Sequence, residues 1–172
     1  MSDDLRLATA VKPEFLELLG AISTNFSSLE FTLSRSIWWL LGSATLEEQH
    51  RYFNVTAQLS FKQLVWMTAS LYRHRFPNEN VEKIESIVKR CFQLEEDRNY
   101  LTHSLWIGQP GVDGVTLLKM TSRSKGVRTT LGAHSRKEFV SVANGLADLS
   151  QEVSEFFMEE MERLLASEPL DS

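Results

Sequence analysis

The chain has 172 residues, of which 42% are hydrophobic, and it carries a formal net charge of −5. This length can bury one core and is short for two ordinary domains, so we expect a single domain over residues 1–172. The single cysteine, Cys91, excludes a disulfide framework and a cysteine-based metal site. The chain begins with acidic residues where a signal peptide has basic ones, and no apolar run approaches the ~20 residues of a membrane span. We therefore expect a soluble, cytoplasmic protein with no membrane contact.

Helices are predicted over most of the first two thirds of the chain. Apolar residues recur at spacings of three and four, and the predicted helices cover about 13–42, 46–52, 60–76 and 78–106. Pro13 and Ser60 are well placed at helix starts, and a helix should end before Pro77. Near its end the first helix is apolar on more than one face, through Trp38 and Trp39, so we expect it to contact two neighbours.

The pattern changes after residue 107. Glycines and a proline interrupt the helix, and the segments VTLLKMTS and VRTTL, separated by SKG, predict a β-hairpin. A last helix is predicted from Ser135 to about Leu165. The expected fold is mainly α: an antiparallel up-and-down bundle of four main helices, with a small β-hairpin (about 107–133) inserted before the last helix.

Basic charge is concentrated in the hairpin. Between Gly114 and Lys137 there is no Asp or Glu, and six basic residues contribute +6, which leaves −11 for the rest of the chain. These residues are Lys119, Arg123, Lys125, Arg128, Arg136 and Lys137. Such a patch can bind a phosphate backbone on an acidic protein because distant charges are screened. The alternative is that these charges only keep a solvated hairpin soluble.

The apolar stripe of the predicted 78–106 helix turns polar partway along. On a helical wheel of about 100° per residue, Arg98, Asn99 and Thr102 occupy the sector that holds aliphatic residues upstream. An Arg or Asn on a buried face is costly unless it is paired. This stretch therefore indicates either an internal salt-bridge network or a water-accessible cleft used for chemistry.

His103 completes this polar group. It follows Asn99 by four residues, so the amide can orient the imidazole. Arg98 and His103 are five residues apart, about 140° around an ideal helix, which does not aim both side chains at one point. We expect a partner helix to close the gap, and hence a homodimer with this helix at or near the interface.

The hexapeptide Arg98-Asn99-Tyr100-Leu101-Thr102-His103 resembles the R-(N/D/H)-x(n)-H motif of the HEPN superfamily. The long helices before the motif, the insertion after it and the closing helix are similar to the architecture of that superfamily. Many of its members are dimeric, metal-independent endoribonucleases, often in toxin–antitoxin or defence systems. The resemblance implies an RNA substrate, Arg and His at a dimer interface, no cofactor, no metal, and an antitoxin or other protein as a further partner.

The residue types fit that chemistry. Cleaving RNA without a metal needs a base, an acid and a cation for the phosphorane charge. His103 matches the base or acid, Arg98 the cation and Asn99 an orienting group, so these three are the expected catalytic residues. The expected substrate-binding residues are Thr102, as a phosphate contact, and the hairpin residues Lys119, Arg123, Lys125 and Arg128.

Two other interpretations remain open. In the first, Arg98 pairs with Glu95 or with a neighbouring helix and His103 only caps the helix end. In the second, the chain is a non-catalytic dimeric helical module whose polar group around Arg98 binds a partner protein or a small anionic ligand. The other histidines, at 50, 74 and 134, show no metal-ligand spacing with each other or with His103, so no metal site is expected.

Overall fold

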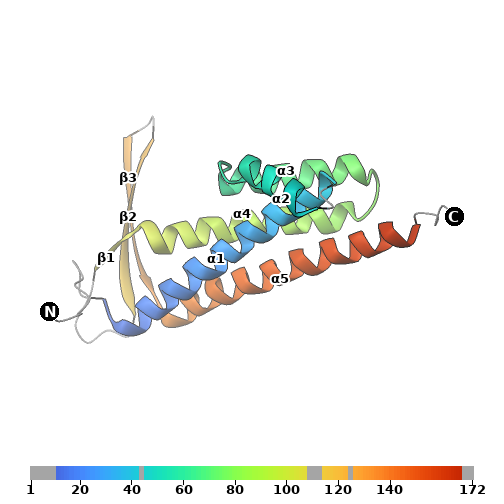
Figure 1. The fold of residues 1–172 in the computed structure, drawn as a ribbon. Helices are drawn as coiled ribbons and strands as arrows, with labels where there is room; N and C mark the ends of the chain where they lie inside the picture. The colour runs from blue at the N-terminus through green and yellow to red at the C-terminus, as the bar shows by residue number, and fades with distance from the viewer. Residues whose placement is uncertain (1–10, 43–44, 108–113, 124–125, 168–172) are drawn as a thin grey trace. The chain divides into compact units, whose positions relative to one another are not determined.

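The computed structural model describes residues 11–42, 45–107, 114–123 and 126–167. Within these ranges the chain is mainly helical, with one small antiparallel sheet (Figure 1). The elements are α1 (Pro13–Leu40), α2 (Leu46–Thr56), α3 (Phe61–Arg75), α4 (Val81–His103), β1 (Leu105–Ile107), β2 (Val115–Arg123), β3 (Gly126–His134) and α5 (Arg136–Ser167). No described helix is long and apolar enough to cross a membrane.

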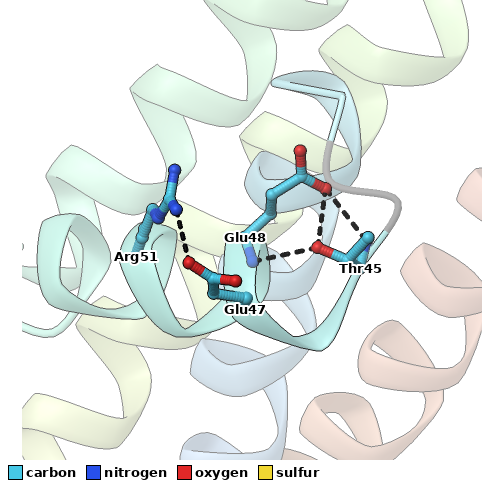
Figure 2. Close-up of polar contacts among 4 residues, drawn as sticks. All are labelled: Thr45, Glu47, Glu48 and Arg51. Carbon is cyan, nitrogen blue, oxygen red and sulfur yellow. Dashed lines mark hydrogen bonds and ion pairs between the residues drawn. The ribbon is translucent and has the colours of Figure 1, made fainter.

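Side chains at the helix starts explain why the predicted helices form. In α2 the Thr45 hydroxyl accepts from the Glu48 backbone N–H while the Glu48 carboxylate accepts from the Thr45 backbone N–H. Figure 2 shows this reciprocal cap beside the Arg51–Glu47 ion pair one turn further on. Each bond satisfies an N–H that the helix itself leaves unpaired. The helix α2 ends at Thr56, past the predicted end at residue 52.

The predicted end of the long helix near Trp106 is wrong, because α4 ends at His103. Two carbonyl groups of the last turn accept hydrogen bonds from side chains that follow the helix. The Ser104 hydroxyl donates to the Tyr100 carbonyl at 2.6 Å, and the Trp106 indole donates to the Leu101 carbonyl at 3.0 Å. Trp106 then belongs to β1, a strand that the sequence pattern did not predict.

The predicted hairpin is confirmed, and it forms two strands of a three-stranded sheet in the order β1-β2-β3. Both pairings are antiparallel. Leu118 pairs with Leu105 on one side and with Leu131 on the other, so one row of leucines crosses all three strands. The first part of the predicted insertion, 108–113, lies outside the described residues.

The chain divides into two compact units. Unit 1 comprises Met1–Thr24 and Leu94–Gly145, and unit 2 comprises Asn25–Gln93 and Leu146–Ser172. The single domain over 1–172 stays a prediction.

Three aromatic rings from different elements form the centre of unit 1. The ring centroids of Phe15 and Trp106 are 6.0 Å apart, those of Phe15 and Phe139 are 5.1 Å apart, and those of Trp106 and Phe139 are 5.3 Å apart. All three pairs meet edge to face, an arrangement that adds to the free energy gained by burying the rings. The cluster therefore ties β1, and with it the end of α4, to α1 and α5.

In unit 2 the long helices α1 and α3 run in the same direction, because the short helix α2 between them reverses the chain. Phe26 packs on Phe61 and Trp39 on Phe76, so α1 and α3 run the same way. The predicted second contact of the first helix is confirmed here, because Trp38 also packs against Phe53 of α2. The Trp38 indole further donates to the Thr56 hydroxyl at 2.9 Å.

We expect Phe139→Ala to lower the free energy of unfolding by about 3–5 kcal/mol, because it removes the ring that contacts both Phe15 and Trp106. Urea denaturation followed by circular dichroism measures the change. The exposed Lys137, two residues away, provides the control Lys137→Ala, for which we expect little loss of stability. Equal effects of the two substitutions would contradict a central role for the aromatic cluster.

Candidate functional site

The residues of the R-N-x-x-x-H motif meet at the end of α4, in unit 1. Arg98 Nη1 donates to Asn99 Oδ1 at 2.8 Å and lies 3.3 Å from His103 Nε2. The expectation that a partner helix must bring Arg98 and His103 together is therefore wrong. The arginine side chain is long and flexible, and it curves around the helix to cover the five-residue spacing.

Asn99 and Thr102 both make contacts within α4. Asn99 holds Arg98, and no described contact links its amide to His103. The Thr102 hydroxyl donates to the Arg98 carbonyl at 2.8 Å, so its proton is already engaged within the helix. A phosphate contact from Thr102 would need that bond to break.

The contact between Arg98 and His103 has a defined direction. A guanidinium can only donate, so His103 Nε2 is the acceptor in this bond. The His103 side chain is exposed, at the last residue of α4. The imidazole is therefore both in contact with Arg98 and open to solvent.

A second group of polar side chains surrounds Tyr100. Lys119 Nζ lies 5.1 Å from the centroid of the Tyr100 ring, and the His134 ring centroid is also 5.1 Å from it. Tyr100 and His103 are three residues apart on α4, so their side chains leave the helix as neighbours. The cation on Lys119 is thus held beside the side chain that adjoins His103.

His134 is fixed in one orientation by α5. Its Nδ1 is 3.2 Å from Glu138 Oε1, and its Nε2 is buried without a hydrogen-bond partner among the described residues. The Ser135 backbone N–H donates to Glu138 Oε2, and this bond is the main reason why the pKa of Glu138 is lowered. Gly132 leaves room for the group, since a Cβ there would lie 2.9 Å from His134 Nε2 and 3.1 Å from the Tyr100 hydroxyl.

The hairpin has one basic face. Lys119 pairs with Thr130 and Thr121 pairs with Arg128, and residues two apart on a strand share a face. Arg128 is therefore on the same face as Lys119, the face that contacts Tyr100. The other two expected hairpin contacts are not placed: Lys125 lies outside the described residues, and of Arg123 only the backbone is described, paired with Gly126.

The opposite face of the sheet is apolar and exposed. The apolar side chains on it that are more than half exposed are Leu105, Met120, Val127 and Leu131. They lie along and beside the row of three leucines that crosses the sheet. The sequence pattern showed the basic residues but did not separate these two faces.

Tyr100, His134 and Glu138 were missed in the sequence. One signal was present: Ser135 and Glu138 have the spacing of a capping box at the start of a helix, and His134 lies four residues before Glu138. The contact between His134 and Tyr100 had no such signal, because it depends on the register of β3.

We expect Glu138→Gln to destabilise the protein at neutral pH and to have little effect in acid. The pKa of Glu138 is lower in the folded chain, so its charge stabilises the fold above the carboxyl pKa of the unfolded chain. That stabilisation disappears as the pH falls through the folded pKa. Urea midpoints measured across this range test it, with Glu159→Gln, at an exposed position of the same helix, as the control. If the difference in urea midpoint between the wild type and Glu138→Gln stays constant with pH, the charge of Glu138 does not stabilise the fold.

Neither a metal site nor a similar protein of known function indicates what the protein does. Among the described residues, no group of three or more His, Cys, Asp or Glu side chains is placed to hold a metal ion. No protein-family model, curated protein or solved structure matches the chain. Function must therefore be inferred from the chemistry of the residues at the end of α4 and on the hairpin.

Proposed function

We propose that the protein is a metal-independent endoribonuclease of the HEPN type that cleaves single-stranded RNA. The observation that carries the proposal is the contact of Arg98 with both Asn99 and His103 at the exposed end of α4. It places a cation next to an imidazole. These match the cation and the base that cleavage through the ribose 2′-OH needs, and solvent supplies the acid.

The proposed reaction begins when a substrate phosphate takes over the N–H donors of Arg98. A guanidinium binds two phosphate oxygens side by side, which a single imidazole nitrogen cannot match. His103 Nε2 then loses its donor and its lone pair becomes available. Arg98 thus masks the base in the free protein and releases it when RNA binds.

The chemical step is an attack of the 2′-oxygen on the adjacent phosphorus. The 2′-OH gives its proton to His103 Nε2, an O–P bond forms, and Arg98 neutralises the charge that develops on the phosphorane oxygens. The bond from phosphorus to the 5′-oxygen breaks, and this oxygen leaves with a proton from solvent. The products are a 2′,3′-cyclic phosphate and a 5′-hydroxyl end. DNA is spared because it has no 2′-OH.

The basic face of the hairpin is the proposed binding surface for the RNA backbone. Lys119 approaches α4 through Tyr100, and Arg128 continues the same face. Phosphate contacts of this kind give affinity without sequence preference. The bound RNA would then run from the hairpin toward the end of α4.

Assembly completes the proposal. The site lies at the end of α4, and a second copy that packs near α4 supplies the opposite wall of the cleft. Since Arg98 and His103 meet within one chain, the second copy closes the cleft and does not assemble the pair.

The purified protein should cleave single-stranded RNA in EDTA and leave 2′,3′-cyclic phosphate ends. We expect His103→Ala to lower the rate by roughly 10²–10⁴-fold, the usual effect of removing a proton-transfer group. Arg98→Ala should lower it by roughly 10²–10³-fold and also weaken RNA binding. Gel assays and mass spectrometry of the product ends measure both.

The matched control is His50→Ala, which removes an exposed histidine on α2. It guards against a contaminating nuclease, because only removal of the proposed base should abolish activity. Cleavage that survives in His103→Ala, or that disappears in EDTA, would contradict the metal-free mechanism.

A second pair of variants tests the basic face. Lys119→Gln with Arg128→Gln removes two positive charges, and Val127→Glu with Leu131→Glu adds two negative charges on the other face, so both change the net charge by the same amount. We expect only the first variant to lower the salt dependence of RNA binding, by about 0.7 in the log–log slope for each phosphate that is no longer neutralised. Fluorescence anisotropy over a salt series measures the slope. Equal slopes would reduce the basic face to a solubility feature.

The apolar outer face of the sheet favours one alternative, a non-catalytic dimeric module that binds a partner protein. Exposed leucine and methionine side chains such as Leu131 and Met120 are typical of protein contacts. Such a module would tolerate His103→Ala, whereas the ribonuclease would not.

A further inference from the structure

A long groove lies between α1 and α5 in unit 2. The two helices run in the same direction, since Ser150 Oγ is 3.2 Å from Ser28 Oγ and 3.1 Å from Thr32 Oγ1, and Trp39 packs on Phe157 further along. Two adjoining cavities of about 390 and 460 Å³ lie along them and share Thr32 and Ser154 as lining residues.

The end of the groove that contains Phe31 is apolar and uncovered. Phe31 is 54% exposed and Met158 is 52% exposed, and Met161 lines the same cavity. Their neighbour Trp38 is covered by Phe53 of α2. The chain therefore covers one apolar side of α1 with its own helices and leaves the side that faces this groove open.

One charge of each sign borders the groove, on opposite walls. Arg35 of α1 lines the apolar cavity and Glu155 of α5 lines the adjoining one. Both are exposed, and among the described residues Arg35 makes no ion pair. Within that same part of the chain, Glu155 accepts a hydrogen bond from Gln151 at 2.8 Å and has no cation beside it.

We infer that a second copy of this chain packs on this groove, about a two-fold axis perpendicular to the helices. In that arrangement α1 of one copy lies on α5 of the other and runs antiparallel to it. Both helices rise 1.5 Å per residue, and Ser150 lies level with α1 between Ser28 and Thr32. Because the two helices run in the same direction, Arg35 and Glu155 are each about five residues further along and lie at about the same level. A two-fold axis near this level brings Arg35 of each copy to the partner's Glu155.

The same axis places apolar surface on apolar surface. Phe31, one turn before Arg35, then faces the partner's α5 between Met158 and Met161, beside the apolar cavity, and the partner's Phe31 enters the first copy's cavity in return. A second copy fits this face better than an unrelated helix, because the face carries both members of the ion pair and both the projecting ring and the cavity that receives it. Such self-complementarity is what a two-fold interface requires.

This contact involves unit 2 alone and goes beyond the proposed function, which concerns unit 1. It is a different surface from the contact near α4 that the sequence predicts. Its test therefore reads the mass of the protein in solution. Absence of cleavage in a protein that dimerises through the groove would contradict only the ribonuclease. A monomer that cleaves RNA would contradict the groove contact and the contact near α4, and would leave the chemistry of Arg98 and His103 standing.

The first experiment is sedimentation equilibrium of the full chain over a range of concentrations. We expect the protein to associate through the groove, and we expect Phe31→Glu to raise the dissociation constant of this contact roughly thirtyfold or more, as for other central interface residues. Leu46→Glu is the matched control, because Leu46 is 69% exposed on α2 and does not line the groove. Circular dichroism and urea midpoints check that both variants are folded. A monomeric wild type, or a dimer that Phe31→Glu leaves unchanged, would overturn the inference, and the latter would point to α4.

The second experiment reverses the charges. Arg35→Glu and Glu155→Arg should each weaken the dimer, because each places like charges face to face across the interface. The double variant restores opposite charges and should recover most of the affinity. Failure of the double variant to recover it would overturn the two-fold arrangement.

Discussion

The rest of unit 1 depends on how Trp106 ends α4. The Trp106 indole N–H donates a hydrogen bond to the Leu101 carbonyl, while the Trp106 ring packs against Phe15 and Phe139 in the core. The first contact stops the helix at His103, and the second fixes the direction in which the chain leaves it. Since Trp106 also pairs with Leu117 of β2, the same residue sets where the sheet lies relative to the helix end. The motif and the basic face are thus positioned by one buried side chain.

The two parts of the candidate site are joined through that arrangement. The register of β2 against β1 brings Lys119 over the Tyr100 ring, and the register of β3 brings His134 to the same ring. A shift of one residue in either pairing would turn Lys119 or His134 to the apolar face. Trp106, Val115 and Leu117 are buried on the same face as Lys119, and they make such a shift costly because it would turn them to the exposed face. The buried apolar side chains of that face therefore help to keep Lys119 and His134 in place.

The helices could be predicted because their signals are local: spacing of apolar residues, a capping serine, a proline. The polar stretch of α4 was predictable for the same reason, as a break in the stripe of one helix. The contact between Arg98 and His103 was not, because a helical wheel gives the direction in which a side chain starts and ignores how far a flexible one can curve. The end of α4, β1 and the contact of His134 with Tyr100 were missed because they depend on Trp106 and on strand register, which no local pattern encodes.

The geometry of Arg98 bears on how a ribonuclease would be kept inactive without its substrate. In the free chain the guanidinium is bound to Asn99 and to the nitrogen that would act as the base. Replacing Asn99 would leave Arg98 with fewer fixed contacts near the helix and would weaken the mask over His103 Nε2. Asn99 would then matter more for holding Arg98 in register with the imidazole than for orienting the imidazole itself. If an RNA phosphate displaces this contact, proton transfer is tied to the presence of RNA, because the cation that uncovers the base is the one that binds the phosphate.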